Sequence, residues 1–192
     1  MPQASHAKTV HQLKITLKWI RPPIWRRVLV GSDISLGELH TVIQHAMGWS
    51  DYHLHDFRVG KVEYGPPEVE PDPFFGRGPK DEDQAILSRV ARSPKSKILY
   101  TYDFGDTWEH EILVEKVIPA DESVRYPVCI AGKRHCPPED CGGPHGYGNL
   151  LEARQDPDHP DYEMYSEWID GSFNPEEFDL KAVNRRLAGR PR

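Results

Sequence analysis

The order of the periodic segments along this chain is the feature that most constrains its fold. Apolar and polar residues alternate over Val10–Lys18, Trp25–Val30, Lys97–Asp103 and Trp108–Ile118, which is typical of strands with one buried face. Helical patterns dominate the last quarter of the chain. Because strands come early and helices late, the sequence predicts an α+β fold rather than β-α units wound around a parallel sheet.

One helix is expected among the early strands. Ser35 is a candidate N-cap, and Glu38 follows three residues later as the second member of a capping box. Gly48 is suited to end the helix. The sequence therefore predicts a helix over Leu36–Met47, and the period-two pattern of His53–Val59 predicts a strand after it.

The middle of the chain is the least regular part. Residues Glu63–Asp83 are rich in proline, glycine and acids, which favours a surface loop or flap. We expect the wider segment 63–96 to be a loop or flap insertion in a single domain that spans residues 1–192. A short helix is predicted at about Asp83–Arg92 and a further strand at about Val124–Ala131.

Three helices are expected near the C-terminal end, over about Tyr147–Gln155, Pro160–Ile169 and Pro175–Leu187. The last has Asn174 as its candidate cap, with proline in the first helical position. Together these patterns predict a mixed, mostly antiparallel sheet of five or six strands, with one early helix and a C-terminal helical cluster.

Composition limits the class of protein. The chain has 192 residues, 38% of them hydrophobic, which suits one globular domain. No apolar run approaches the roughly 18 residues that cross a bilayer, and the start lacks the order of a secretory signal. We therefore expect a cytoplasmic protein without a membrane partner. The net charge of −6 disfavours nonspecific nucleic-acid binding, although arginines cluster at Arg21, Arg26 and Arg27.

Four histidines fall on predicted apolar faces. His110 shares a strand face with Ile112, His53 and His55 share one with Phe57, and His40 lies on the apolar stripe of the early helix. A buried imidazole without a partner costs about 1–3 kcal/mol. These side chains therefore need hydrogen bonds, a metal ion or a wet pocket.

One interpretation is a metal site. His53, His55 and His110 are the candidate ligands, because histidines two residues apart on a strand can share one divalent ion such as zinc. Asp103 and Asp106 flank the neighbouring turn and would either complete the ligand set or orient ligands or water. The alternative is a purely structural polar network, in which the two aspartates only stabilise the Phe104–Thr107 turn.

The pair Glu139 and Asp140 precedes Gly142–Gly143 and supplies candidates for a general base. The alternative is a polar connector that starts the next helix. A serine nucleophile elbow and a phosphate-binding loop are both absent from the sequence.

The cysteines are a second metal candidate. Cys129, Cys136 and Cys141 lie close together in the sequence, with His135 and His145 beside them. Their spacing differs from that of common zinc ribbons and knuckles. Structural zinc, free buried thiols and a redox pair all remain open.

Several motifs in a fixed order resemble a known family. The segments that carry the resemblance are Leu13–Ile15, Ile20–Arg27, Leu39–His40, Met47–Trp49, His53–Phe57, Tyr102–His110 and Cys136–Gly143. They resemble the plasmid pRiA4b ORF-3 family, some members of which are labelled as passenger proteins of an IS1096-type mobile element. The resemblance covers about residues 10–187. It implies an α+β fold around a curved sheet and carries no established activity.

Two functions follow as hypotheses. The first is a binding or adaptor module associated with mobile elements, with a protein or nucleic-acid partner. The second is a metal-dependent, hydrolase-like enzyme that uses the His/Asp site.

Overall fold

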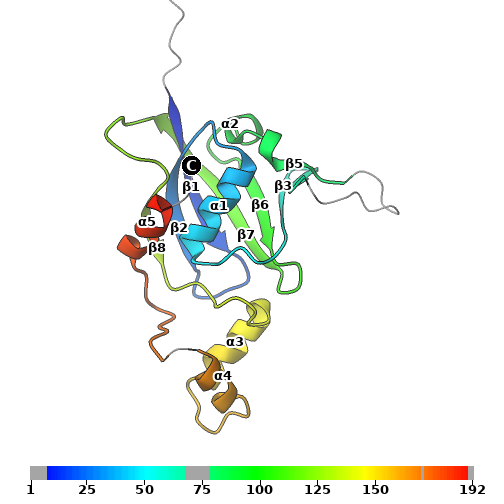
Figure 1. Ribbon diagram of the computed structural model, residues 1–192, viewed down its shortest axis with the longest axis vertical. Coiled ribbons are helices and arrows are strands. Elements are labelled where there is room, and N and C mark those ends of the chain that lie inside the picture. The colour runs from blue at the N-terminus through cyan, green and yellow to red at the C-terminus, as the bar shows by residue number, and fades with distance from the viewer. Residues whose placement is uncertain (1–7, 68–77, 170, 190–192) are drawn as a thin grey trace, which may run out of the picture.

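One eight-stranded sheet forms the centre of the described structure. A computed structural model describes residues 8–67, 78–169 and 171–189, and Figure 1 shows its arrangement. The sheet order is β5-β4-β3-β6-β7-β1-β2-β8; only β4 and β5 pair in parallel. The strands are β1 Thr9–Leu17, β2 Trp25–Gly31, β3 His55–Val59, β4 Val62–Gly65, β5 Lys80–Asp81, β6 Lys97–Tyr102, β7 Trp108–Pro119 and β8 Val128–Lys133. The predicted α+β class with a mixed, mostly antiparallel sheet is confirmed.

The strand count differs from the predicted five or six. Strands β4 and β5 are four and two residues long, and all of their residues except Val62 lie in the segment predicted as a loop. Strands this short show no readable alternation in a sequence rich in proline and glycine. The tip of the predicted flap, residues 68–77, lies outside the described residues.

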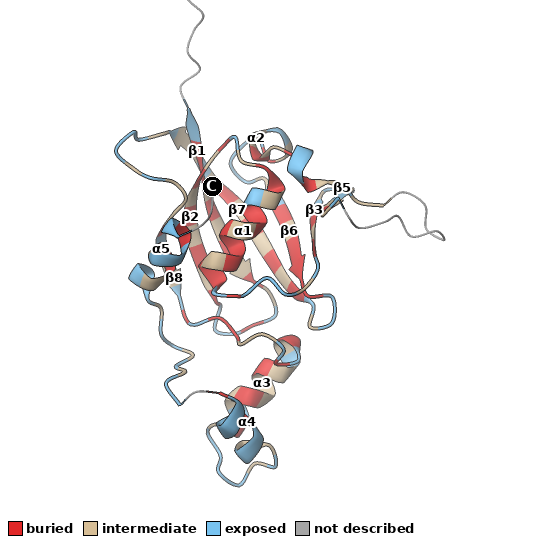
Figure 2. Ribbon diagram, viewed as in Figure 1, coloured by how far each residue is buried: buried red, intermediate tan, exposed pale blue. Residues whose placement is uncertain are grey.

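Helix α1, Leu36–Met47, covers one face of the sheet (Figure 1). It forms as predicted: the Ser35 Oγ accepts from the Glu38 amide, the Glu38 carboxylate accepts from the Ser35 amide, and Gly48 ends the helix in a left-handed conformation. Its inner face and the facing strands are buried (Figure 2). This helix and sheet layer contains most of the hydrophobic core.

The remaining helices lie on two sides of this layer. Helices α3, Gly143–Ala153, and α4, Tyr162–Trp168, extend beyond one end of the sheet, while α5, Leu180–Ala188, packs against α1 and β8 (Figure 1). Between β5 and β6, a 3₁₀ turn, Glu82–Gln84, and α2, Leu87–Val90, replace the longer helix predicted there.

The start of α5 corrects the predicted cap. Asn174 closes only a turn, and the helix begins after Asp179, whose side chain accepts from the Ala182 amide. The intervening Phe178 ring packs closely on Gly132 and lies 4.7 Å from the Arg26 guanidinium. Tertiary packing of this aromatic side chain thus replaces the first turn that Pro175 would favour.

Among the described residues, none of the helices combines the length and apolarity that a membrane span requires.

Candidate functional site

Three connecting segments meet at one end of β3 and β6. They are the 48–54 loop that leads into β3, the 103–107 turn between β6 and β7, and the 134–142 loop after β8. Each brings one candidate side chain, namely His53, Asp103 and Asp140. Loops held on a rigid sheet are common places for binding and catalytic residues.

The three side chains converge closely. His53 Nε2 lies 3.0 Å from Asp140 Oδ1 and 3.7 Å from Asp103 Oδ2, and the three ligand atoms all lie within 4.8 Å of one another. The His53 nitrogen is shielded from solvent, yet it makes no hydrogen bond of good geometry within the described part of the chain. The Asp103 side chain is 11% exposed and the Asp140 side chain 68%, so the cluster is closed on one side and open on the other.

The hairpin turn fixes Asp103. Its Oδ1 accepts from the backbone amides of Gly105 and Asp106, at 2.9 and 3.3 Å, which leaves Oδ2 facing His53. The residue has φ of 56°, and Asp140 has φ of 60°. Left-handed backbone is uncommon outside glycine, although aspartate tolerates it better than most residues, and it often occurs at functional sites.

Gly142 and Gly143 dock the third segment onto this turn. The Gly142 amide donates to Asp106 Oδ2 at 3.1 Å. Gly143 has φ of 67°, and a Cβ there would overlap the backbone of Asp106. Only glycine suits this close approach and this dihedral together, so the glycine pair places Asp140 beside Asp103.

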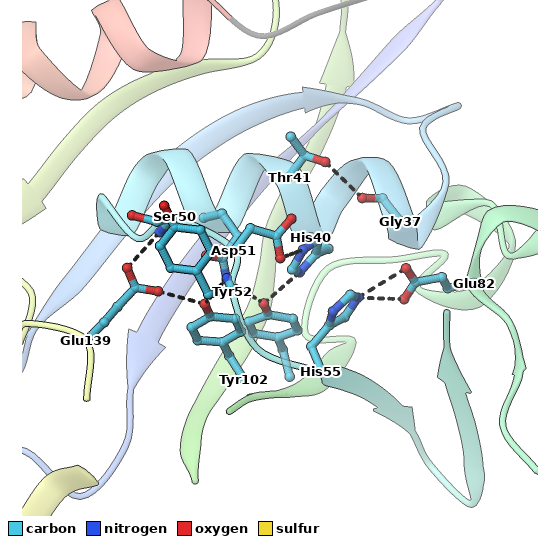
Figure 3. A network of polar contacts seen from close by, with 12 residues as sticks. Gly37, His40, Thr41, Ser50, Asp51, Tyr52, His55, Glu82, Tyr102 and Glu139 are labelled. Atoms are coloured by element: carbon cyan, nitrogen blue, oxygen red, sulfur yellow. Dashed lines mark hydrogen bonds and ion pairs between the residues drawn. The ribbon is translucent and has the colours of Figure 1, made fainter. Parts of the chain in front are cut away.

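Glu139 braces the same loop from the other side. Its two oxygens accept from the Tyr102 hydroxyl at 2.7 Å and from the Ser50 amide at 2.9 Å (Figure 3). The Trp49 indole donates to the Pro137 carbonyl at 3.0 Å. Burial, helped by Glu139, raises the pKa of Tyr102, so its hydroxyl keeps the proton that it donates.

A second group of histidines lies deeper, between α1 and β3. The rings of His40 and His55 stack with their centroids 3.5 Å apart and their planes 5° from parallel. His55 Nε2 lies 3.0 Å from Glu82 Oε2, and His40 Nε2 lies 2.8 Å from Asp51 Oδ1 (Figure 3). The other His40 nitrogen is bonded to the Tyr100 hydroxyl at 2.8 Å. These rings are therefore held by hydrogen bonds on separate sides.

Stacking prevents this pair from chelating one ion. The ligand atoms of His40, Asp51 and His55 also lie within 4.8 Å of one another. However, a metal ion binds in the plane of an imidazole ring, about 2.0–2.1 Å from the nitrogen. Two nearly parallel planes share no such point, so the stack is a structural polar network in the geometry observed.

Burial keeps His40 and His110 neutral at neutral pH. Burial and the nearby His55 ring together lower the pKa of His40 to about 4, while Asp51 opposes the shift. Burial also lowers the pKa of His110 to about 4, and its Nδ1 is bonded to the Trp108 carbonyl at 2.9 Å. The His110 Nε2 is buried and has no hydrogen-bond partner among the described residues, and His110 belongs to neither group of three clustered ligand atoms.

The cysteines are separate buried thiols. Among the described residues, none of Cys129, Cys136 and Cys141 joins a group of three metal-ligating side chains, and all three are free. The Cys129 Sγ donates to the Ala131 carbonyl at 3.3 Å, and the Cys136 Sγ contacts Met47 Sδ at 3.1 Å. Burial raises the pKa of each thiol, to about 12 for Cys141, so each thiol keeps its proton at neutral pH when no metal ion is bound.

The structure thus gathers some of the predicted site residues and separates others. His53, Asp103 and Asp140 come together, with Asp106 and Glu139 as their supports, whereas His55 and His110 have other partners. Sequence reasoning missed Asp51, Glu82, Tyr100 and Tyr102. A signal existed for the tyrosines: both share the inward face of β6, where a buried hydroxyl needs a partner.

Comparisons with known proteins add a family. The model of the family described as "Plasmid pRiA4b ORF-3-like protein" matches residues 9–182. The uncharacterized protein y4hQ of Sinorhizobium fredii (strain NBRC 101917 / NGR234) is 40% identical over 177 residues, which cover 92% of this chain and 87% of that protein. The crystal structure of MM3350 from Methanosarcina mazei Go1, a protein of unknown function, is similar with a TM-score of 0.80 and 39% identity. That alignment covers 91% of this chain and 97% of the other.

Proposed function

We propose that this chain, which belongs to the plasmid pRiA4b ORF-3-like family, binds one divalent metal ion through His53, Asp103 and Asp140 and uses it in hydrolysis. One observation carries the proposal. The shielded His53 nitrogen lacks a hydrogen bond of good geometry and faces two carboxylates from two other segments. An imidazole held in this way is ready to bind a cation.

The donor set favours particular ions. Imidazole suits zinc and other borderline transition metals, while carboxylates also suit manganese and magnesium. Three protein ligands with one open side match the usual arrangement of a catalytic zinc, where water takes the free position. A zinc ion in such a site lowers the pKa of bound water to about 7 and thereby supplies a nucleophile at neutral pH.

The surrounding residues take supporting roles under this proposal. Asp106 fixes the glycine pair, and Glu139 fixes the loop to Tyr102 and Ser50. Because both Glu139 oxygens already accept hydrogen bonds, we assign it a positioning role rather than that of a general base. The cost of bringing Asp103 and Asp140 together is offset when a cation is bound.

The test begins with metal content. Untagged protein purified without chelator should contain about one zinc or manganese ion per chain by elemental analysis. After chelation, calorimetric titration with each ion should show one site, weakened at least tenfold in His53→Ala and in Asp140→Asn. His145→Ala is the matched control, since His145 is exposed, lies near Asp140 in the sequence and is outside the cluster.

Two results would contradict the metal site. One is that neither zinc nor manganese binds. The other is unchanged metal affinity in the variant that combines His53→Ala with Asp140→Asn. Binding lost in Cys136→Ala instead would move the site to the cysteines. Hydrolysis is tested separately with nitrophenyl phosphate and nitrophenyl ester substrates, and any turnover should require metal and disappear in Asp140→Asn.

A binding module without catalysis is the second candidate function, and a specific surface favours it. Three exposed apolar side chains adjoin the cluster in sequence: Tyr52 is 82% exposed, Leu54 56% and Phe104 53%. Exposed aromatic groups on a rigid loop are typical of protein-binding surfaces. Two results together would support this function over hydrolysis. The protein would bind metal without hydrolysing the substrates, and Tyr52→Ala and Phe104→Ala would abolish binding to a protein partner.

A further inference from the structure

Arg26 is a buried arginine whose charge has no carboxylate partner among the described residues. Its side chain points from β2 toward α1 and α5, and the residue is 3% exposed. Its donors reach the carbonyls of Ala46, Trp25 and Lys133, at 2.9 to 3.0 Å, and the Cys136 sulfur at 3.1 Å. All four acceptors are uncharged groups when the thiol is protonated.

Neighbouring arginines show what is unusual here. Arg27 forms a two-pronged pair with Glu115, at 2.6 and 2.8 Å. Arg134, also 3% exposed, donates to Glu176 at 2.9 Å. Buried charges are normally paired with opposite charges, because removing an ion from water is costly.

The Cys136 thiol does not supply the missing negative charge. Burial raises its pKa, although Arg26 and Arg186 oppose the shift, and its proton is directed at Met47 Sδ. Cys136 is therefore a neutral neighbour of the guanidinium. The positive charge remains uncompensated.

A cavity opens beside this charge. It has a volume of about 650 Å³, and its lining comes from β2, the end of α1, the loop after β8, and residues of α4 and α5 with the chain between them. Its walls include the rings of Phe173 and Phe178, and Phe178 lies over the Arg26 guanidinium at 4.7 Å. Its size is within the range of small-molecule sites, and its lining combines aromatic rings with charged side chains.

A second arginine lines the same cavity. Arg186 of α5, an exposed residue whose side chain reaches the cavity, donates from Nε to the His45 carbonyl at 2.9 Å. Burial lowers its pKa, and the positive charge of Arg26 adds to this effect, so the two guanidinium groups are close enough to repel each other. Two cations held together around one cavity are favoured when an anion binds between them.

Three acidic side chains also line the cavity, and each is engaged or exposed. Glu139 is engaged with Tyr102 and Ser50, and Asp179 caps α5 and opposes the lowering of the Arg186 pKa. Glu177 is exposed, and water screens its charge. Among the described lining residues, Arg26 is therefore the buried charge, and the Phe178 ring lies against it.

We propose that this cavity binds a small organic anion, with a carboxylate or phosphate group held by Arg26 and Arg186 and an apolar or aromatic body against Phe173 and Phe178. This site is independent of the His53 cluster and of the hydrolysis proposed for it.

Benzoate, phenyl phosphate and uncharged benzamide are the probes for the full-length chain. Calorimetric titration is carried out with EDTA present, so that binding to a metal ion contributes nothing. Either or both of the anions should bind at one site per chain, and benzamide should bind at least tenfold more weakly. The stronger of benzoate and phenyl phosphate then identifies the preferred anionic group.

Variants locate the site. Arg186→Gln should weaken the binding of the anion about tenfold. Arg185, the adjacent residue, is also exposed and lies 3.8 Å from Asp179, and Arg185→Gln should leave the affinity for the anion unchanged. Arg186→Lys should restore part of the affinity, which distinguishes charge from packing. Asp140→Asn should have no effect.

Three results would overturn the proposal: equal binding of benzoate and benzamide, equal effects of Arg186→Gln and Arg185→Gln, or no binding of either anion up to millimolar concentration. Arg26→Gln serves as a second variant if it folds, as judged by thermal unfolding. It should abolish anion binding while leaving metal binding at His53 intact.

Discussion

Two histidine clusters in this protein contain similar donor atoms in different geometries. His53 faces two carboxylates at the open end of the sheet, whereas His40 and His55 stack between α1 and β3. Both groups bring three ligand atoms within 4.8 Å. The comparison shows that proximity of donors is insufficient for a metal site, because the lone pairs must also converge on one point.

The two clusters also differ in what their hydrogen bonds do. Each ring of the stack has its own acidic partner, Asp51 for His40 and Glu82 for His55. At the His53 cluster, hydrogen bonds go to the supports of the ligands and leave the His53 nitrogen without one of good geometry. We therefore expect the stack to contribute stability and the open cluster to contribute binding.

The largest expected effect of a substitution is on the buried pair. Glu82→Ala should lower the free energy of unfolding by up to about 3 kcal/mol, because it leaves the buried His55 Nε2 without its hydrogen-bond partner. Urea denaturation measures this loss. Glu63→Ala removes the exposed partner of Arg58 and should change stability by less than about 0.5 kcal/mol. Equal losses in the two variants would contradict the role assigned to the stack.

Lowering the pH should also destabilise the protein through the buried histidines of the stack. The pKa of His40 is about 4 in the folded protein and ordinarily about 6.5, so the unfolded chain binds this proton first as pH falls. The stability that neutral His40 supports is complete above pH 6.5 and declines between pH 6.5 and 4, by about 3 kcal/mol.

His110, whose pKa is also about 4, contributes in the same direction. His40→Gln should therefore reduce the pH slope of stability by one proton, measured by urea denaturation at pH 7, 5.5 and 4.5. His145→Gln, an exposed control, should retain the full slope. A wild-type stability that stays constant down to pH 4 would refute the buried neutral state.

Much of the fold was predictable because local signals agreed with tertiary structure. The capping box of Ser35 and Glu38 with Gly48 defines α1 in both sequence and structure. The predicted start of the last helix, at Pro175, was wrong, because the packing of Phe178 on Gly132 overrides the favourable cap at Asn174. Short edge strands carry too few residues to show a period.

The candidate site was predictable only in part. The sequence named His53 as a ligand, Asp103 as a ligand or an orienting group, and Asp140 as a general base, but it did not predict that these three side chains converge. His55 was expected beside His53, but its partner Glu82 comes from a segment without readable periodicity. Side-chain direction beyond the end of a strand depends on loop backbone, such as the φ of 60° at Asp140, and spacing does not encode it.

A glycine substitution sharpens the comparison by disrupting one cluster alone. Gly143→Ala places a side chain at φ of 67° against the Asp106 backbone, which should cost about 1–2 kcal/mol. It should also displace Asp140 and weaken the binding of zinc or manganese at least tenfold. Gly148→Ala in α3 meets nothing within 4 Å and should leave metal affinity unchanged. Thermal unfolding and titration of both variants test this, and unchanged affinity in Gly143→Ala would show that the docking does not position Asp140.

The smallest stability effect is expected at Asp140 and has a distinctive sign. Without metal, Asp103 and Asp140 are like charges within 4.8 Å, so Asp140→Asn should be neutral or stabilise the protein by a few tenths of a kcal/mol, up to about 0.5. A bound ion stabilises the folded wild type, and the stabilisation grows with the concentration of the ion relative to its Kd. The variant lacks one ligand and therefore gains less of this stabilisation. The order of thermal stability should therefore reverse when zinc or manganese is added, with the wild type becoming the more stable protein. In Asp51→Asn, the matching change at the stack, metal should stabilise the protein as it does the wild type. If metal shifted the unfolding of Asp140→Asn as much as that of the wild type, the distinction between an open binding cluster and a closed structural one would fail.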